Sequence, residues 1–316
     1  MKLMSIIKKQ GNLAFIKRLL KAGTIHTIIG ELLLLGKDRT ALEIARLSIE
    51  FKTKSKLQKK YGKYLEEFDK VNSENDLEHI SSDIVWFCWF QGLDNAPKLV
   101  RKCYESLKRN LYNHKIVVIT ADNITNYVDF PPYIIEKWDR GIITNTHMTD
   151  LLRLELLIKY GGTWIDATVL CTRDEKEIPN YYFDTDLFFY QILKPGRDGC
   201  STYMSSWYIT AKSNNKILLA TRYLCYKYWE KNNFLIDYFL LHDFMSIVLE
   251  KYQEDWKNVI PVDNATPHIL LLRLFEQYNI ELWQSIVEQS PFHKLSYKFS
   301  KEQEQTEGTF YKKIVG

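Results

Sequence analysis

The sequence lacks the features that mark disulfide-rich, disordered or membrane-spanning proteins. Its five cysteines are widely spaced and include no Cys-x-x-Cys pair, which argues against a zinc or redox motif and favours a reducing compartment. Lysines and arginines interrupt the apolar positions of residues 1–22, and no run of roughly 18 apolar residues exists, so neither a spanning helix nor a secretory signal is expected. With 46% hydrophobic residues and no repeat or low-complexity tract, the composition predicts a globular, cytoplasmic protein.

Positive charge is concentrated at the N-terminus. Residues 1–70 carry 16 Lys and Arg against 7 Asp and Glu, whereas the whole chain has a net charge of only +4. Apolar residues at helical spacing predict a basic helical arm over 1–78, before a main domain over 79–316; the two stripes are Leu13, Ile16, Leu19 and Leu20, and Ile28, Ile29, Leu32, Leu33 and Leu35. Such helices can bind an anionic membrane surface, at the inner face of the cell membrane, or pack on the main domain. The sequence does not distinguish membrane binding from packing on the main domain. Nucleic acid is not an expected partner, because the basic surplus lies apart from the aromatic-rich half.

The main domain has the pattern of an α/β fold. Residues 83–92 and 115–122 are apolar runs of strand length, and residues 98–110 between them are helical in pattern. Strand, helix and strand at this spacing predict a parallel βαβ unit with a right-handed crossover. Residues 187–193 and 205–212 predict further strands. The last twenty residues are charged and need not be ordered. We therefore expect a mixed, mainly parallel sheet flanked by helices.

Residues 144–170 hold the densest chemistry in the chain. They predict a helix capped by Thr146 or Thr149, a stop at Gly161-Gly162, and a buried strand that ends at Asp166. Asp150 and Arg153 are three residues apart in the predicted first turn, so they are neighbours on the helix surface. Asp166 follows the strand at the edge of an α/β sheet where ligands bind. The three side chains together predict a site for a small polar ligand.

The pattern T-D-x2-R-x6-Y-G-G-x-W-x-D resembles the sugar-nucleotide site of retaining GT-A glycosyltransferases. It is most similar to the capsular polysaccharide synthesis family, which is related to the glycosyltransferase 32 group. In that family an Asp and an Arg on the helix precede an Asp-x-Asp metal motif, which begins sixteen residues after the first Asp. Asp150 and Asp166 have this separation. The chain departs from the pattern at Thr168, which stands where the second Asp of the metal motif would be.

The resemblance implies a role for each of several residues. The implied catalytic residues are Asp166 and Asp237, and the donor sugar would contact Asp150, Arg153, Gly162 and Ser206. The nucleotide would lie at the exit of the first strand, on Cys88, Trp89, Gln91 and Gly92, and near Asp166. Asp166, His268 and Thr168 would face a divalent cation, Mn²⁺ or Mg²⁺, because hard cations neutralise diphosphates and an imidazole ligand favours Mn²⁺.

Another acidic motif does not fit this assignment. Asp184-Thr-Asp186 is a literal Asp-x-Asp, but it precedes the predicted strand 187–193. We therefore expect it at the opposite edge of the sheet from Asp166. Asp237 and His242 are five residues apart near the predicted start of a helix, where a capping or a buried polar role is also plausible.

The function that the resemblance implies is hexosyl transfer with retention of configuration. The donor would be a UDP-sugar, with galactose favoured over glucose, and the acceptor a lipid-linked oligosaccharide in capsular polysaccharide biosynthesis. No single motif holds the paired carboxylates of a glycosidase, so the departing phosphate would accept the proton of the acceptor. The alternatives are a nucleotide-sugar-binding protein with weak or no turnover, and a toxin-like glycosyltransferase that modifies a protein.

Overall fold

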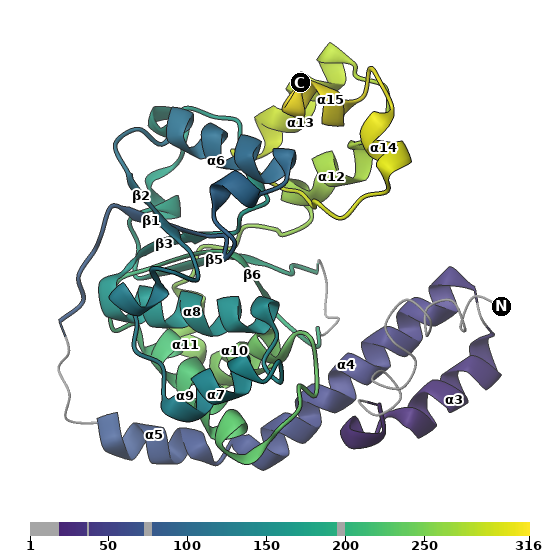
Figure 1. Cartoon of the computed structure of the whole chain (residues 1–316). Coiled ribbons are helices and arrows are strands. Elements are labelled where there is room, and N and C mark those ends of the chain that lie inside the picture. Colours follow the sequence, from purple (N-terminus) through teal and green to yellow (C-terminus); the bar gives the residue numbers. More distant parts are fainter. Residues whose placement is uncertain (1–18, 37, 73–77, 195–199) are drawn as a thin grey trace.

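A computed structural model describes residues 19–36, 38–72, 78–194 and 200–316 (Figure 1). Five strands form the central sheet in the order β2-β1-β3-β6-β5; they are β1 (Ile84–Cys88), β2 (Lys115–Ile119), β3 (Gly162–Ile165), β5 (Leu187–Gln191) and β6 (Met204–Ala211). β1 pairs in parallel with β2 and with β3, whereas β6 is antiparallel to both β3 and β5. Four of the five strands therefore run in the same direction, and the predicted mainly parallel α/β sheet is confirmed.

Helices cover both faces of the sheet, as Figure 1 shows. On one face lie α7 (Pro132–Asp139), α8 (Asn145–Tyr160), α9 (Lys216–Lys231), α10 (Leu240–Lys251) and α11 (Gln253–Lys257). The other face carries α6 (Lys98–Asn110), which has the predicted bounds. Successive strand side chains point to opposite faces, so Trp86 and Trp164 pack into the core under α8, while Phe87 and Ile165 pack into the core on the side of α6. Both faces are buried, which explains the nearly continuous apolar runs.

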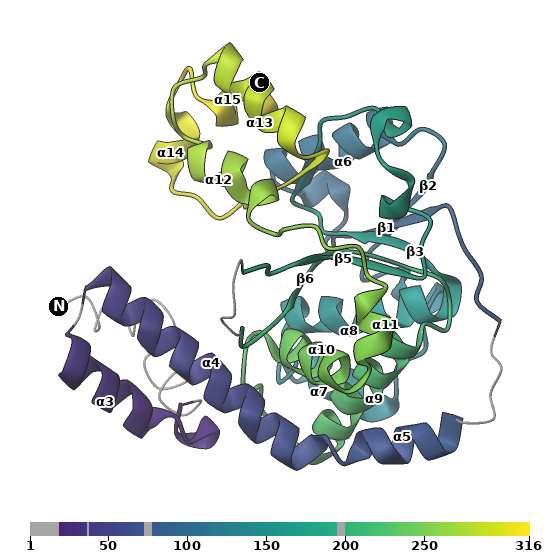
Figure 2. The same cartoon turned by 180° about the vertical axis from the view of Figure 1, so that it is seen from behind.

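The C-terminal residues form a helical lobe beside α6 (Figure 2). It contains α12 (Ile269–Arg273), α13 (Ile280–Gln289), α14 (Lys301–Gln305) and α15 (Phe310–Val315). The expectation that the last twenty residues need not be ordered is wrong, because Phe310 and Tyr311 are buried against Leu99 and Cys103 of α6. A two-stranded sheet links this lobe to the centre: β7 (Phe292–Lys294) pairs with β4 (Val169–Cys171). Short 3-10 turns span Leu93–Asn95, Ile124–Asn126, Glu175–Glu177, Asn180–Tyr182 and Thr266–His268.

The N-terminal arm is helical, as expected. It comprises α3 (Ile25–Leu35), α4 (Arg39–Tyr61) and α5 (Tyr64–Asn72), while residues 13 and 16 of the first predicted stripe lie outside the described residues. The C-terminal part of α4 packs on the main domain: Tyr61 is 1% exposed and belongs to the same core cluster as the residues of α9 and α10. α3 and the start of α4 extend away from the sheet (Figures 1 and 2). The domain boundary at residue 78 stays a prediction. The main hydrophobic core contains residues from both sides of this boundary.

Two glycines join α8 to β3 because no side chain fits there. Gly161 and Gly162 have φ of +67° and +92°, a region that disfavours residues with a Cβ. A Cβ on Gly162 would lie 2.4 Å from the carbonyl oxygen of Ile84 on β1, and one on Gly161 would lie 2.8 Å from the carbonyl oxygen of Ile80. The close backbone approach lets a buried helix turn directly into a buried strand. It also fixes the position of the residue that follows β3, which is Asp166.

Candidate active site

Helix α8 lies between the sheet and α9, and it is buried on nearly all sides. Its N-cap is Thr144, whose hydroxyl accepts from the amide of His147 at 3.3 Å. The predicted caps Thr146 and Thr149 are therefore wrong: both lie inside the helix. Because α8 begins earlier than expected, Asp150 is in its second turn and Arg153 in its third. They still share one surface of the helix, and this surface faces the carboxyl ends of β1 and β3.

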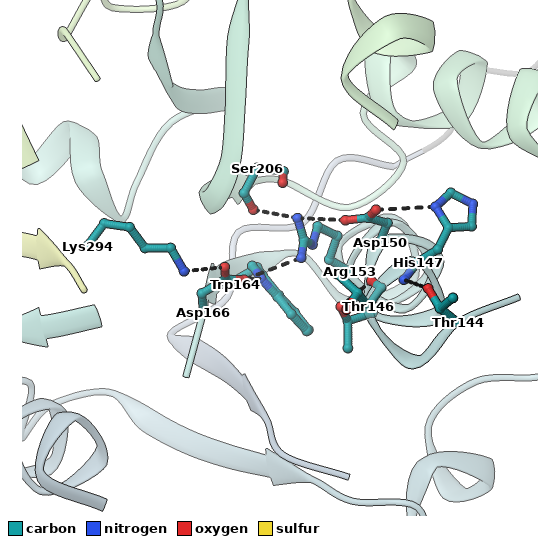
Figure 3. A network of polar contacts seen from close by, with 10 residues as sticks. Thr144, Thr146, His147, Asp150, Arg153, Trp164, Asp166, Ser206 and Lys294 are labelled. Atoms are coloured by element: carbon teal, nitrogen blue, oxygen red, sulfur yellow. Dashed lines mark hydrogen bonds and ion pairs between the residues drawn. The ribbon is translucent and has the colours of Figure 1, made fainter. Parts of the chain in front are cut away.

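Arg153 connects the two carboxylates of the predicted motif. Its Nη1 is 3.1 Å from Oδ1 of Asp150 and donates to the carbonyl oxygen of Ser206 at 2.9 Å, while Nη2 donates to Oδ1 of Asp166 at 3.3 Å. The guanidinium also lies 5.0 Å from the ring centroid of Trp164, within range of a cation–π contact. Figure 3 shows the connected side chains. The structure therefore brings together Asp150, Arg153 and Asp166, as predicted, and the arginine is fixed by several contacts at once.

A histidine holds the second oxygen of Asp150. Trp229 of α9 donates from its indole Nε1 to Nε2 of His147 at 2.9 Å. Since an indole N–H can only donate, Nε2 is the acceptor, and the ring proton is on Nδ1. Nδ1 lies 3.3 Å from Oδ2 of Asp150. Asp150 is thus held between His147 and Arg153, and its side chain is only 8% exposed.

Asp166 lies at the end of β3, where two cations flank it. Oδ1 accepts from Nε1 of Trp164 at 2.9 Å as well as from Arg153, and Oδ2 accepts from the ammonium of Lys294 at 2.7 Å. Burial disfavours the charged carboxylate, but the charges of Lys294 and Arg153 outweigh it and hold the pKa of Asp166 below its usual range. With its side chain 24% exposed, Asp166 remains accessible to a ligand.

Lys294 is a site residue that sequence reasoning missed. It lies on β7, opposite Val169 of β4, and its ammonium also donates to the hydroxyl of Thr168 at 2.8 Å. The amide of Leu295 donates to the carbonyl oxygen of Thr168 at 2.9 Å, which fixes the backbone beside it. No local signal could have found this lysine, because it is 128 residues from Asp166 and a three-residue strand has little periodicity.

Among the described residues, the predicted metal ligands already have hydrogen-bond partners within the protein. Both oxygens of Asp166 already accept from N–H donors, and the hydroxyl of Thr168 accepts from Lys294. Within the described ranges, no three side chains of His, Cys, Asp or Glu are grouped to hold a metal ion. His268, the third predicted ligand, donates from Nδ1 to the carbonyl oxygen of Asn264 at 2.7 Å. Burial lowers the pKa of His268, and the nearby charge of Lys294 lowers it further.

The predicted nucleotide-binding residues lie at the same edge as Asp166. β1 and β3 are parallel with Trp86 opposite Trp164, so this register places Cys88 beside Asp166. Burial raises the pKa of the Cys88 thiol to about 12, which makes it a packing residue rather than a nucleophile. Trp89 lies edge-on to Tyr297, with ring centroids 5.2 Å apart. Gln91 and Gly92 continue into the loop, where Gly92 has φ of +76°.

Three predicted residues differ from the expectation in position or role. Gly162 begins β3 and therefore lies at the opposite end of that strand from Asp166, so its role is to allow close backbone packing. Ser206 reaches the network through its carbonyl oxygen rather than its hydroxyl. Asp237 precedes α10 instead of opening it, and it accepts from the amide of Phe239 at 2.7 Å.

The Asp184-Thr-Asp186 motif lies at the far edge of the sheet, as expected. Asp184 accepts from the hydroxyl of Ser81 at 3.0 Å, and Ser81 lies just before the start of β1.

Two residues near α10 were not assigned to the site from sequence. Tyr238 is 50% exposed, and burial together with the carboxylate of Asp150 raises its pKa. Burial lowers the pKa of His242 to about 4, so its ring is neutral near pH 7, and Asp150 and Arg153 are among the charges that act on it.

Two surface cavities lie away from this site, one of about 790 Å³ beside α4 and one of about 520 Å³ beside α5 and α9. Neither is lined by Asp150, Arg153, Asp166 or Lys294.

Carboxylates, an arginine and a lysine lie together at the carboxyl edge of the α/β sheet, where ligands bind in such folds. These groups can hydrogen-bond the hydroxyls and negative charges of a small polar ligand. The chain belongs to the capsular polysaccharide synthesis protein family, whose model matches residues 41–314. The resemblance stated from the sequence is thereby confirmed.

Two curated relatives of the chain are named O-glycosyltransferases. The chain is 28% identical over 162 residues to the O-glycosyltransferase braB of Annulohypoxylon truncatum and 24% identical over 171 residues to the O-glycosyltransferase PaGT of Phomopsis amygdali. Each match covers 46% of this chain, but only 37% and 41% of those relatives. The chain thus spans less than half the length of the curated relatives. Among solved structures, it is similar to the PaToxG glycosyltransferase with a TM-score of 0.36 and 14% identity, over 86% of this chain and 96% of that one. A likeness at this level indicates nothing about activity.

Proposed function

We propose that this protein is a retaining glycosyltransferase that moves a hexose, galactose in preference to glucose, from a UDP-sugar to a hydroxyl of a lipid-linked oligosaccharide. The observation that carries the proposal is the Asp150–Arg153–Asp166 network, which lies at the carboxyl ends of β1 and β3. Membership of the capsular polysaccharide synthesis family supports it. So do the names of the two curated relatives, both O-glycosyltransferases.

The geometry suits the tasks that glycosyl transfer requires. Asp150 and Arg153 would hold the hexose hydroxyls, because a carboxylate accepts from them and a guanidinium donates to them. The bond between the anomeric carbon and the β-phosphate oxygen breaks, and its electron pair stays on that oxygen. The acceptor hydroxyl forms the new bond on the same face, and its proton passes to the departing phosphate. Asp237, in the loop before α10, would face the acceptor.

Turnover of a panel of nucleotide sugars by the purified protein tests the proposal. We expect release of UDP from UDP-galactose, and more slowly from UDP-glucose, because epimers differ only in how one hydroxyl pairs with the site. Mass spectrometry would record nucleotide release, and the anomeric proton signal in NMR would identify the anomer formed. Preference for a GDP- or CMP-sugar would contradict the donor assignment, and an inverted product would contradict retention. Tight binding of UDP-sugars with no turnover would favour the nucleotide-sugar-binding alternative.

The same proposal places the protein at the cytoplasmic face of an anionic membrane. No helix of the described ranges is long and apolar enough to cross a membrane. Helix α3 buries none of its residues, and Leu33 and Leu34 are 81% and 83% exposed. On neighbouring α4, Phe51 is 62% exposed, and the basic side chains along this helix include Lys52, Lys56, Lys59 and Lys60. Exposed leucines on the same helical arm as exposed basic side chains suit binding to anionic headgroups.

Replacing Leu33 and Leu34 together by Ser is expected to weaken binding to vesicles of phosphatidylglycerol and phosphatidylcholine by roughly tenfold or more, because burial of each leucine contributes about 1.5–3 kcal/mol. Cosedimentation would measure the binding at low salt, and added salt would reduce the electrostatic part. Leu272→Ser is the matched control: Leu272 is 79% exposed, but it lies in α12 of the C-terminal lobe. Equal binding by the wild-type protein and the double variant would count against the membrane proposal.

A further inference from the structure

The charge between β3 and β7 differs from that of a metal-binding Asp pair. Two carboxylates would carry two negative charges and attract a divalent cation, whereas Asp166 and Thr168 carry only one. The ammonium of Lys294 lies 2.7 Å from Oδ2 of Asp166 and 2.8 Å from the hydroxyl of Thr168, so the formal charge of the three side chains together is zero. A site without net negative charge has little electrostatic attraction for Mn²⁺ or Mg²⁺.

The coordination chemistry agrees with the charge. Mg²⁺ requires nearly octahedral oxygen ligands at about 2.0–2.1 Å, and a cation bound to the remaining lone pair of Asp166 would lie close to the positive charge of Lys294, which is 2.7 Å from Oδ2. Oδ1 is held by Trp164 and Arg153, and Oδ2 by Lys294. As noted above, the described residues contain no cluster of three His, Cys, Asp or Glu side chains that could complete a metal shell.

Lys294 is well placed to act as the cation itself. An ammonium has three N–H donors, and Asp166 and Thr168 accept from two of them, which leaves the third for a phosphate oxygen. The pairing of β7 with β4 and the bond from the Leu295 amide to the Thr168 carbonyl hold the backbone of Lys294 in register. Its side chain is 20% exposed, so it is partly shielded from water, and its ammonium points toward Asp166 (Figure 3).

We propose that Lys294 takes the place of the divalent cation: its ammonium binds the diphosphate of the donor and stabilises the negative charge that develops on the leaving UDP. The inference rests on the proposed function. Asp166 and Thr168 position the ammonium, and as the bond to the anomeric carbon breaks, the electron pair left on the β-phosphate oxygen is stabilised by a charge already fixed beside it. The reaction then needs no Mn²⁺ or Mg²⁺.

Titration calorimetry with UDP separates this inference from the alternatives. The full-length protein, treated with EDTA, is expected to bind UDP as tightly as it does after addition of Mn²⁺ or Mg²⁺, within about threefold. Lys294→Met, which keeps the unbranched apolar stem but lacks the ammonium, is expected to weaken binding by roughly tenfold or more, since charge-assisted hydrogen bonds are among the stronger ones. Lys294→Arg should retain most of the affinity. Lys298→Met, which removes an exposed lysine of the same segment, is the control and should bind UDP as the wild-type protein does.

Each other outcome has a definite meaning. Wild-type binding that appears only with Mn²⁺ or Mg²⁺ would overturn the role of Lys294 and leave the proposed function standing. Unchanged UDP affinity in folded Lys294→Met, as judged by its circular dichroism, would also overturn it. If Lys294→Met does not fold, Lys294→Arg decides: a loss of UDP affinity of about tenfold or more in folded Lys294→Arg, relative to the wild-type protein, contradicts the inference. Absence of UDP binding under every condition would overturn the proposed function itself.

Discussion

Asp166→Asn is expected to lower sugar transfer from the UDP-sugar by roughly 10²–10³-fold, the range found when a preorganised electrostatic contact is removed from a catalytic site. Asparagine keeps the shape of the side chain and can still accept from Trp164. It lacks the negative charge that pairs with Arg153 and Lys294 at 3.3 and 2.7 Å, so both cations lose the partner that positions them. Initial rates of UDP release would measure the loss, and thermal unfolding would verify that the variant folds.

The matched control for this variant is Asp184→Asn. Asp184 accepts from Ser81 at 3.0 Å at the amino-terminal edge of the sheet, in an exposed position, and it belongs to the literal Asp-x-Asp motif. We expect its rate to be that of the wild-type protein. If Asp184→Asn lost turnover and Asp166→Asn kept it, the site would lie at the other edge of the sheet.

Asp150→Asn is expected to remove turnover with every UDP-sugar and also to destabilise the protein. The guanidinium of Arg153 is 4% exposed, and its Nε already has no partner among the residues that the structure describes. Removing one charge from a buried ion pair costs about 3–5 kcal/mol when the other charge is left uncompensated. The cost is expected to be lower here, because Asp166 still pairs with Arg153 at 3.3 Å and the amide oxygen of the new asparagine can accept from it. Urea denaturation would measure the change in the free energy of unfolding.

Binding measurements distinguish a contact to the donor sugar from simple destabilisation. If Asp150 holds the hexose, Asp150→Asn weakens the binding of UDP-galactose much more than that of UDP. Glu155→Gln is the matched control, because Glu155 is also on α8 and forms a partly buried ion pair, with Arg222 at 2.9 Å, in which its side chain is 12% exposed. We expect this control to lose stability and to keep its preference for UDP-galactose over UDP. Equal losses for both ligands in Asp150→Asn would contradict the assignment to the sugar.

The elements that depend on neighbouring residues could be predicted from the amino-acid sequence alone. Apolar runs and their spacing predicted β1, α6 and β2, and the helix–glycine–strand pattern predicted α8, Gly161-Gly162 and β3. The three-residue spacing of Asp150 and Arg153 placed both on one surface of α8 wherever the helix began, which is why the error in its N-cap did not disturb the predicted pair. Ligands bind at the carboxyl ends of parallel strands, and this rule placed Asp166 in the predicted site and the Asp184-Thr-Asp186 motif at the opposite edge of the sheet.

The distant side chains that complete the site could be identified only from the folded chain. Lys294 reaches Asp166 across 128 residues through the pairing of β7 with β4, and Trp229 fixes the tautomer of His147 from α9, 82 residues away. Helical and strand periodicity reports which face of an element is buried, but not which element covers it. The contacts between elements arise from packing of the whole chain. Lys294 could therefore not be identified from the motif that contains Asp166, and that motif predicts only the divalent cation that we propose Lys294 replaces.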